Sequence, residues 1–195
     1  MKYLISFLFL ALAFSMKSEA KVTLPSILGD NMVLQQQAEV KLWGKARPNA
    51  TVTVKTSWNG QTYKFSSDGK GGWSLTVSTP VAGGPYKIIF NDGELLTLQN
   101  VLIGEVWFCS GQSNMEMPMG CFDRQPVRGA NDIIAKAKPS TPIRMYTTDS
   151  KDGRWVRQFS KTPAEDCQGE WLENTPVNVS HISAVSYYFA RYIQE

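Results

Sequence analysis

Residues 106–115 read Val-Trp-Phe-Cys-Ser-Gly-Gln-Ser-Asn-Met. An apolar run of strand-forming residues stops at Ser110 and Gly111, and a second serine, Ser113, follows two residues later. Open α/β sheets bury apolar strands at their centre and bind ligands at the carboxyl ends of those strands. We therefore expect residues 103–108 to form a buried strand that delivers Ser113 as a nucleophile, with Gly111 allowing a sharp turn between them.

The residues around Ser113 separate two classes of serine hydrolase. The nucleophile elbow of the α/β-hydrolases reads Gly-x-Ser-x-Gly, and Met115 occupies the place of its second glycine, which excludes that class. Residues 111–115 instead resemble the first motif of the SGNH (GDSL-like) hydrolases. The motif has the Gly-Gln-Ser-Asn form of the carbohydrate O-acetylesterases, in particular the sialate O-acetylesterases.

The resemblance extends along nearly all of residues 21–195. Segments similar to that family occur in the same order at residues 24–26, 30–35, 42–44, 72–73, 83–86 and 103–107. Residues 182–191 resemble a family helix that usually reads Phe-Ser-Ala-Val-x-Tyr-x-Phe.

The resemblance implies which residues carry the chemistry and which are missing. Ser113 would be the nucleophile, and its backbone N–H would be an oxyanion donor. A serine needs a neighbouring base, which in SGNH hydrolases comes from an Asp-x-x-His motif near the end of the catalytic domain. The sequence contains no Asp-x-x-His, and its one histidine, His181, falls outside the family's catalytic motif. We therefore expect a truncated catalytic domain and a chain that is inactive alone.

The segment before residue 101 reads as short strands separated by turns. Apolar and polar residues alternate, and Asn59-Gly60 is a strong hairpin signal. Expected strands cover residues 40–43, 51–55, 62–65, 73–77, 86–90 and 95–98. About seven short strands without a helical period predict a β-sandwich domain at residues 21–100.

The pattern changes at about residue 101. After the strand at 103–108, the sequence predicts a helix at 131–138, a strand at 142–147 and a helix at 183–194. Two strands and two helices are too few to enclose a core. We interpret residues 101–195 as the first, incomplete part of an α/β (flavodoxin-like SGNH) hydrolase domain.

The composition and the first residues bear on location and partners. The chain has 195 residues, 43% of them hydrophobic, and a net charge of +3 without a basic block, so nucleic acid is not an expected partner. Residues 1–20 have the layout of a signal peptide: Lys2, an apolar core, and a small-x-small site ending at Ala20. We expect an exported chain, periplasmic or extracellular, with no membrane span after signal cleavage.

Several further residues are candidates for the site or its support. Gln112 and Asn114 flank Ser113 and could touch substrate. Of the three cysteines, Cys109 should be buried, whereas Cys121 and Cys167 lie in loop-like sequence and could form a disulfide. There is no clustered Cys/His set and no glycine-rich phosphate loop, so neither a metal nor a cofactor is implied.

Two function classes remain open. The first is a serine esterase that removes O-acetyl groups from carbohydrate, with sialic acid as the expected sugar. An acetylxylan esterase is the nearest alternative, because the motif indicates ester hydrolysis but does not indicate which sugar carries the ester. The second class is a non-catalytic β-sandwich that binds carbohydrate or another partner, which the missing base favours for the chain by itself.

Overall fold

The computed structural model describes residues 21–148, 150–151, 154–155 and 166–194, so the expected signal peptide lies outside the described residues. The first strands along the chain are β1 (Val33–Gln35), β2 (Glu39–Lys45), β3 (Thr51–Thr56), β4 (Thr62–Ser66), β5 (Gly72–Ser78), β6 (Gly83–Asn91) and β7 (Leu95–Gly104). The elements that follow are α2 (Ser113–Glu116), α3 (Ala130–Lys136), β8 (Arg144–Tyr146), β9 (Ser150–Lys151), β10 (Arg154–Trp155), β11 (Trp171–Glu173), α4 (Pro176–His181) and α5 (Ala184–Gln194).

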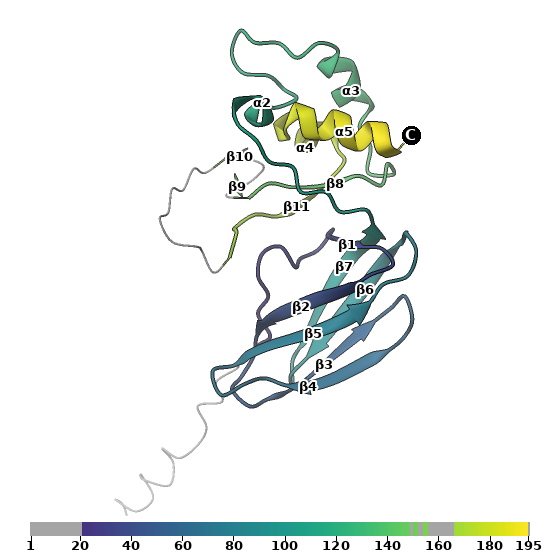
Figure 1. Ribbon diagram of the computed structural model, residues 1–195, viewed down its shortest axis with the longest axis vertical. Helices are drawn as coiled ribbons and strands as arrows, with labels where there is room; N and C mark the ends of the chain where they lie inside the picture. Colours follow the sequence, from purple (N-terminus) through teal and green to yellow (C-terminus); the bar gives the residue numbers. More distant parts are fainter. Residues whose placement is uncertain (1–20, 149, 152–153, 156–165, 195) are drawn as a thin grey trace, which may run out of the picture.

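The first part of the chain is made of strands, as its alternating sequence predicts. Five strands form a mixed sheet in the order β1-β7-β6-β3-β4, in which β1 runs parallel to β7 and the other pairs are antiparallel (Figure 1). Strands β2 and β5 form a separate antiparallel pair. The expected turn at Asn59-Gly60 joins β3 to β4, and Gly60 has the left-handed φ of 68° that favours glycine.

One hydrophobic core lies between the five-stranded sheet and the β2–β5 pair. Leu42 and Val77 enter it from the pair, and Val54 and Phe90 enter it from the sheet, all without exposed surface. The indole of Trp73 packs between Phe65 and Phe90, with ring centroids 5.3 and 5.7 Å away. Burying side chains of this size stabilises the fold by about 1.5–3 kcal/mol each.

Strand β7 crosses the expected boundary at residue 101 without interruption. Its last residues pair with β1 in the register Leu34↔Ile103 and Gln35↔Gly104, so they belong to the first sheet. The expected domain change therefore falls inside a strand, and the chain leaves the sheet only after Gly104.

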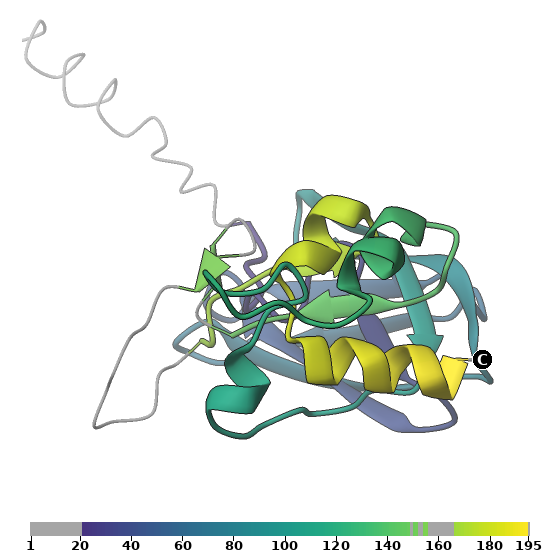
Figure 2. The same ribbon diagram turned by 90° about the horizontal axis from the view of Figure 1, so that it is seen from above.

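The helices gather beyond the end of the sheet at which β7 finishes (Figures 1 and 2). With β8 and its partner β11 they enclose a second, smaller core, so the expectation that this part has too few elements to enclose a core is wrong. Its largest members are Met119, Ile143, Met145, Ile182 and Tyr187. The two expected helices are confirmed as α3 and α5, and the strand expected at 142–147 is confirmed as β8. No helix in the described part of the chain is long and apolar enough to cross a membrane.

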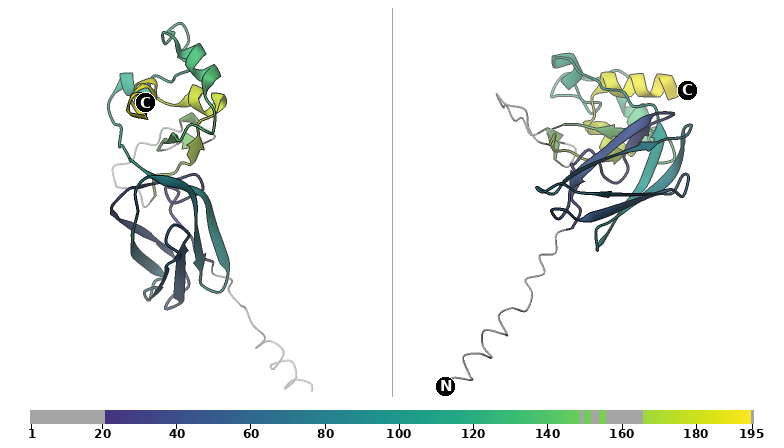
Figure 3. Two further views of the ribbon diagram at one scale, coloured as in Figure 1. Left: turned by 90° about the vertical axis from the view of Figure 1, so that its right-hand side faces the viewer. Right: turned by 60° about the horizontal axis from the view of Figure 1, so that its bottom comes forward.

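The two parts of the chain lie end to end (Figure 3), and polar contacts join them. The Ser26 hydroxyl donates to Asp166 Oδ1 at 2.9 Å and lies 2.8 Å from the Tyr146 hydroxyl. Desolvation raises the pKa of Tyr146 well above its usual range. Within the second part, Arg144, whose side chain is 4% exposed, pairs with Glu173 at 3.3 Å, and the Asn100 amide of β7 donates to the same carboxylate at 2.9 Å. The sequence carries no local signal for these contacts, because the partners at Ser26 are at least 120 residues apart.

Candidate active site

Ser113 is the first residue of α2, a single helical turn, and it is exposed. The turn closes through a hydrogen bond from the Met115 N–H to the Gln112 carbonyl at 2.9 Å. In the described part of the chain the Ser113 side chain has no hydrogen-bond partner. The candidate nucleophile is therefore open to solvent, with no base bonded to it among the described residues.

The expected buried strand at residues 103–108 is wrong beyond Gly104. Residues 105–112 form no strand, and Val106, Trp107 and Phe108 are 44, 58 and 89% exposed. A strand needs hydrogen-bonding neighbours, and β1 and β6 pair with β7 only as far as Gly104 and Ile103. After that point, no described strand lies on either side of the chain. Residues 106–108 are as apolar as a buried strand, but no neighbouring strand is present to bury their side chains.

Glu105 fixes the direction in which the chain leaves β7. Glu105 is exposed. It accepts hydrogen bonds from the Gln36 and Gln35 amides at 2.6 and 3.1 Å. These bonds, that from Gln36 first, lower the pKa of Glu105. The Gln35 side chain also accepts the Val106 N–H at 2.9 Å.

Gly111 lies at a point where a side chain would obstruct the chain, as the sequence predicts. Its φ is not left-handed, so no unusual backbone angle depends on it. A Cβ atom at this position would instead lie 2.4 Å from Cγ of Met115 and 3.3 Å from its Cβ. The glycine makes room for the side chain of Met115, the residue whose N–H closes the α2 turn.

Gln112 and Asn114, which flank Ser113, are both exposed, and their contact with substrate stays a prediction.

The chain after α2 is anchored to α4 and the residue after it by two backbone hydrogen bonds. The Met119 N–H donates to the Ile182 carbonyl at 2.9 Å, and the Gly120 N–H donates to the Ser180 carbonyl at 2.8 Å. Met119 is fully buried, so this segment packs into the second core.

His181 ends α4, next to the residues that hold Met119 and Gly120. It is exposed and makes no hydrogen bond with Ser113 among the described residues. The structure thus joins α4 to the chain after the nucleophile but forms no Ser–His pair. No group of three His, Cys, Asp or Glu side chains in the described ranges could hold a metal ion.

The disulfide considered between Cys121 and Cys167 is not formed, because both are free cysteines. Cys121 is exposed in a turn that its N–H closes on the Pro118 carbonyl at 3.0 Å. Cys167 instead lies at the junction of the two parts, 3.5 Å from the Tyr146 hydroxyl. The expected burial of Cys109 is also wrong, since that thiol is exposed in the unpaired segment before Ser113.

The known proteins that the chain resembles are carbohydrate esterases. It is 27% identical to the sialate O-acetylesterase of Homo sapiens over 188 residues, which cover 87% of this chain and 34% of that protein. The sialate O-acetylesterase of Mus musculus is 26% identical over 185 residues. A carbohydrate acetylesterase from Xanthomonas citri, solved by crystallography, superposes with a TM-score of 0.78 at 30% identity, covering 89% of this chain and 37% of that one.

The resemblance to the carbohydrate O-acetylesterases is confirmed. No protein-family model matches the chain. The chain spans about a third of the length of the curated relatives that it matches, which are 34% and 32% covered. The similarity to these O-acetylesterases thus covers most of this chain and a minor part of each relative.

Proposed function

We propose that the chain is the nucleophile-bearing part of a carbohydrate O-acetylesterase, with O-acetylated sialic acid as its substrate. The observation that carries the proposal is Ser113, exposed within Gly-Gln-Ser-Asn directly after the segment that leaves β7. Similarity to sialate O-acetylesterases along 87% of the chain supports the choice of sugar. Acetylxylan is the rival substrate, because the similar Xanthomonas protein is a carbohydrate acetylesterase, a name that does not specify the sugar.

The domain organisation is part of the proposal. Residues 21–100 would form a β-sandwich, and residues 101–195 would begin a flavodoxin-like SGNH hydrolase domain. The core shared by the β2–β5 pair and the five-stranded sheet supports the first assignment. The second assignment is supported by Val106, Trp107 and Phe108, which are apolar but exposed. A continuous apolar run is typical of a central strand of a parallel sheet, where a strand on each side would pair with it.

The reaction follows from the chemistry of a serine esterase. The Ser113 oxygen attacks the acetyl carbonyl while a base removes the hydroxyl proton, and the Ser113 N–H stabilises the oxyanion. The bond to the sugar oxygen breaks, the sugar leaves as an alcohol with that proton, and water hydrolyses the acetyl-serine. The one histidine of the sequence, His181, makes no hydrogen bond with Ser113 among the described residues. We therefore propose that the base comes from polypeptide outside residues 1–195.

Export is the remaining part of the proposal. Residues 1–20 would be removed as a signal peptide, and the mature chain would begin at Lys21 in the periplasm or outside the cell. N-terminal sequencing of exported product tests this point. Intact Met1 on protein recovered from the cytosol would contradict it.

The esterase proposal is tested by a chimera in which this chain replaces the matching part of the Xanthomonas citri acetylesterase. Acetate release is measured from O-acetylated sialic acid and from acetylxylan. We expect turnover of the sialate ester, and Ser113→Ala should lower kcat by orders of magnitude with little change in KM. Ser110→Ala is the matched control and should keep activity. A folded chimera that does not depend on Ser113 would overturn the proposal, and hydrolysis of acetylxylan alone would overturn the choice of sugar.

A further inference from the structure

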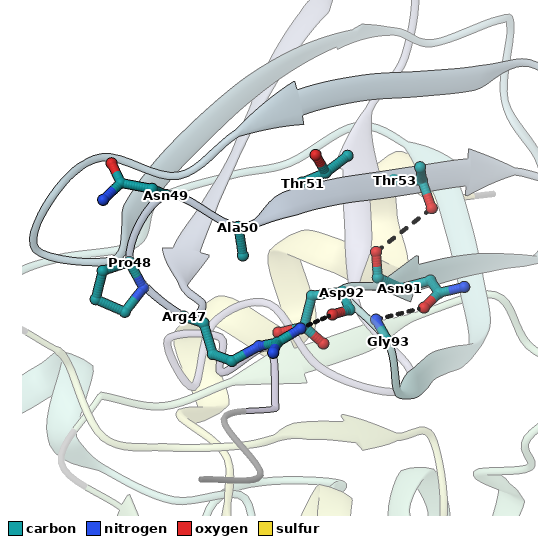
Figure 4. Close-up of a pocket in the computed structure, with 9 residues that line it drawn as sticks. All are labelled: Arg47, Pro48, Asn49, Ala50, Thr51, Thr53, Asn91, Asp92 and Gly93. Atoms are coloured by element: carbon teal, nitrogen blue, oxygen red, sulfur yellow. Dashed lines mark hydrogen bonds between the residues drawn. The ribbon is translucent and has the colours of Figure 1, made fainter. Parts of the chain in front are cut away.

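A hollow of about 550 Å³ lies at the end of the five-stranded sheet where β7 begins (Figure 4). Its walls are the loop between β2 and β3, the start of β3, and the turn between β6 and β7. A strand rises by about 3.3 Å per residue, so β7 separates this hollow by roughly 30 Å from the point where the chain leaves toward Ser113. The hollow is therefore separate from the candidate active site.

Asp92 lines the hollow and is the feature that calls for a ligand. The residue is 5% exposed, and both carboxylate oxygens are buried with no hydrogen-bond partner among the described residues. Burying a carboxylate without a donor costs several kcal/mol, and such groups are otherwise paired in folded proteins. A bound molecule that donates hydrogen bonds would remove this cost.

The walls of the hollow are held in place by hydrogen bonds. On one side, the buried Ser67 hydroxyl donates to the Arg47 carbonyl and accepts the Ala50 N–H at 3.0 Å. On the other side, the Gly93 N–H bonds to the Asn91 side chain at 2.8 Å. A site whose backbone is fixed in advance loses little entropy when it binds a ligand.

The charges around Asp92 decide which ligand fits. Arg47 is exposed, and its guanidinium donates to the Asp92 carbonyl at 2.8 Å, so it lies beside the carboxylate (Figure 4). A lone metal cation would be repelled by Arg47, and a phosphate would be repelled by Asp92. Thr51 and Thr53 add hydroxyl groups, and no aromatic ring lines the hollow. The ligand must therefore be polar and must both donate and accept hydrogen bonds.

We propose that this hollow is a saccharide-binding site, in which one sugar hydroxyl donates to Asp92 and another accepts from Arg47. Two hydroxyls on adjacent carbons of a sugar ring lie close together, so one can donate a hydrogen bond while the other accepts one. Both carboxylate oxygens of Asp92 are buried, so the proposal requires the exposed Arg47 side chain to turn outward when the sugar reaches them. The choice of a saccharide among polar ligands rests on the proposed function, since that function places the chain on acetylated carbohydrate.

The test is a titration of the ¹⁵N-labelled full chain with xylose, xylotetraose and N-acetylneuraminate. We expect saturable shifts of the backbone amides at residues 47–53 and 91–93 with at least one of the three. A response to xylotetraose without xylose identifies a glycan chain, and the reverse identifies a free sugar. Asp92→Asn should weaken binding by at least about tenfold, because a hydrogen bond to a charged carboxylate is replaced by a weaker one to a neutral amide.

Further variants separate this site from the esterase proposal and from a structural role. Ser113→Ala should bind sugar as the wild type does, so loss of esterase function and loss of this site are distinguishable. Asp123→Asn is the matched control, an exposed carboxylate outside the hollow that should leave binding unchanged. Asp92→Asn should keep or raise the melting temperature, because it removes a buried charge that accepts no hydrogen bond. Arg47→Gln is the second test of binding and should also weaken it.

Four results would overturn the proposal. The first is sugar binding unaffected by both Asp92→Asn and Arg47→Gln. The second is a set of shifts that maps outside the hollow. The third is a response of the amides to calcium chloride or sodium phosphate, titrated in the same way, without a response to any of the three sugars. The last is a large drop in melting temperature for Asp92→Asn, which would assign the carboxylate to the fold.

Discussion

Trp107 and Phe189 meet edge to face, with ring centroids 5.2 Å apart and ring planes at 83°. Trp107 belongs to the unpaired segment before Ser113, and Phe189 lies on α5, so this contact ties the segment to the helix. Both rings are partly exposed, at 58 and 39%. Val185, Tyr192 and Ile193 continue the exposed apolar surface along α5.

We expect Trp107 and Phe189 to be energetically coupled. Trp107→Leu and Phe189→Leu should each destabilise the chain, and a double-mutant cycle should give a coupling of about 0.5–1.5 kcal/mol, the usual value for an edge-to-face pair. Urea unfolding of the four proteins measures it. Phe108→Leu is the control, because Phe108 is 89% exposed, and it should change stability by less than about 0.5 kcal/mol. Additive effects at Trp107 and Phe189 would show that the contact contributes nothing.

A second prediction concerns Gly111 and Met115. Gly111→Ala should destabilise the α2 turn by about 1 kcal/mol, the low end for overpacking, because Met115 is only half-buried. Met115→Ala in the same chain should recover most of this loss, since the clashing Cγ is gone. Thermal unfolding of the single and double variants measures both effects.

Gly69→Ala is the matched control for that series. A Cβ atom at Gly69 would meet nothing within 4 Å, and its φ is not left-handed. The substitution should be neutral or slightly stabilising, because it restricts only the unfolded chain. If Gly111→Ala behaves like Gly69→Ala, the steric role of Gly111 is wrong.

Local sequence patterns are enough to find most elements of the fold. Alternation and turn residues locate the strands from β2 to β7, and helical spacing locates α3 and α5. The pattern fails at residues 105–108. Their apolar composition indicates that the segment favours a buried strand, but it does not show whether neighbouring strands are present to pair with it. Burial there depends on pairing partners, and β1 and β6 both stop short of Glu105.

The candidate sites are less accessible to sequence reasoning. Ser113 can be found because its motif is contiguous in the chain. The hollow at Asp92 brings together a loop near Arg47 and a turn that lies 45 residues later, and neither segment contains a recognisable motif. The sequence predicts that Gly111 allows a turn that a side chain would obstruct, but only the structure identifies Met115 as the side chain that a larger residue would meet. Contacts of this kind depend on side-chain placement that residue types alone do not specify.

A third prediction is a pH dependence of stability that arises at Asp68. Its carboxylate accepts the Lys70 and Gly72 N–H groups at 2.7 and 2.8 Å, and these bonds lower its pKa from 3.8. A lowered native pKa stabilises the fold above the unfolded value, and this stability is lost as the pH falls through the native pKa. Melting curves of the wild type and Asp68→Asn should therefore differ above about pH 4 and converge at lower pH.

The Lys70 side chain offers the control for this effect. The backbone bond from Lys70 is the largest cause of the lowered pKa of Asp68, whereas the charge of Lys70 contributes less than burial does. Lys70→Ala keeps the backbone bond, so it should preserve most of the pH-dependent difference. A gap between wild type and Asp68→Asn that is constant across the acid range would contradict the assignment.

The last prediction is that the isolated chain hydrolyses p-nitrophenyl acetate no faster than its Ser113→Ala variant. A serine hydroxyl is a weak nucleophile until a base within hydrogen-bond reach takes its proton. The exposed Ser113 has no such partner in the described part of the chain, and His181 ends α4 without bonding to it. His181→Ala should therefore leave the slow background rate unchanged, as should Ser110→Ala. If the wild-type chain turns over, and His181→Ala and Ser113→Ala each abolish that turnover, then His181 is the base and the chain is an esterase without outside help.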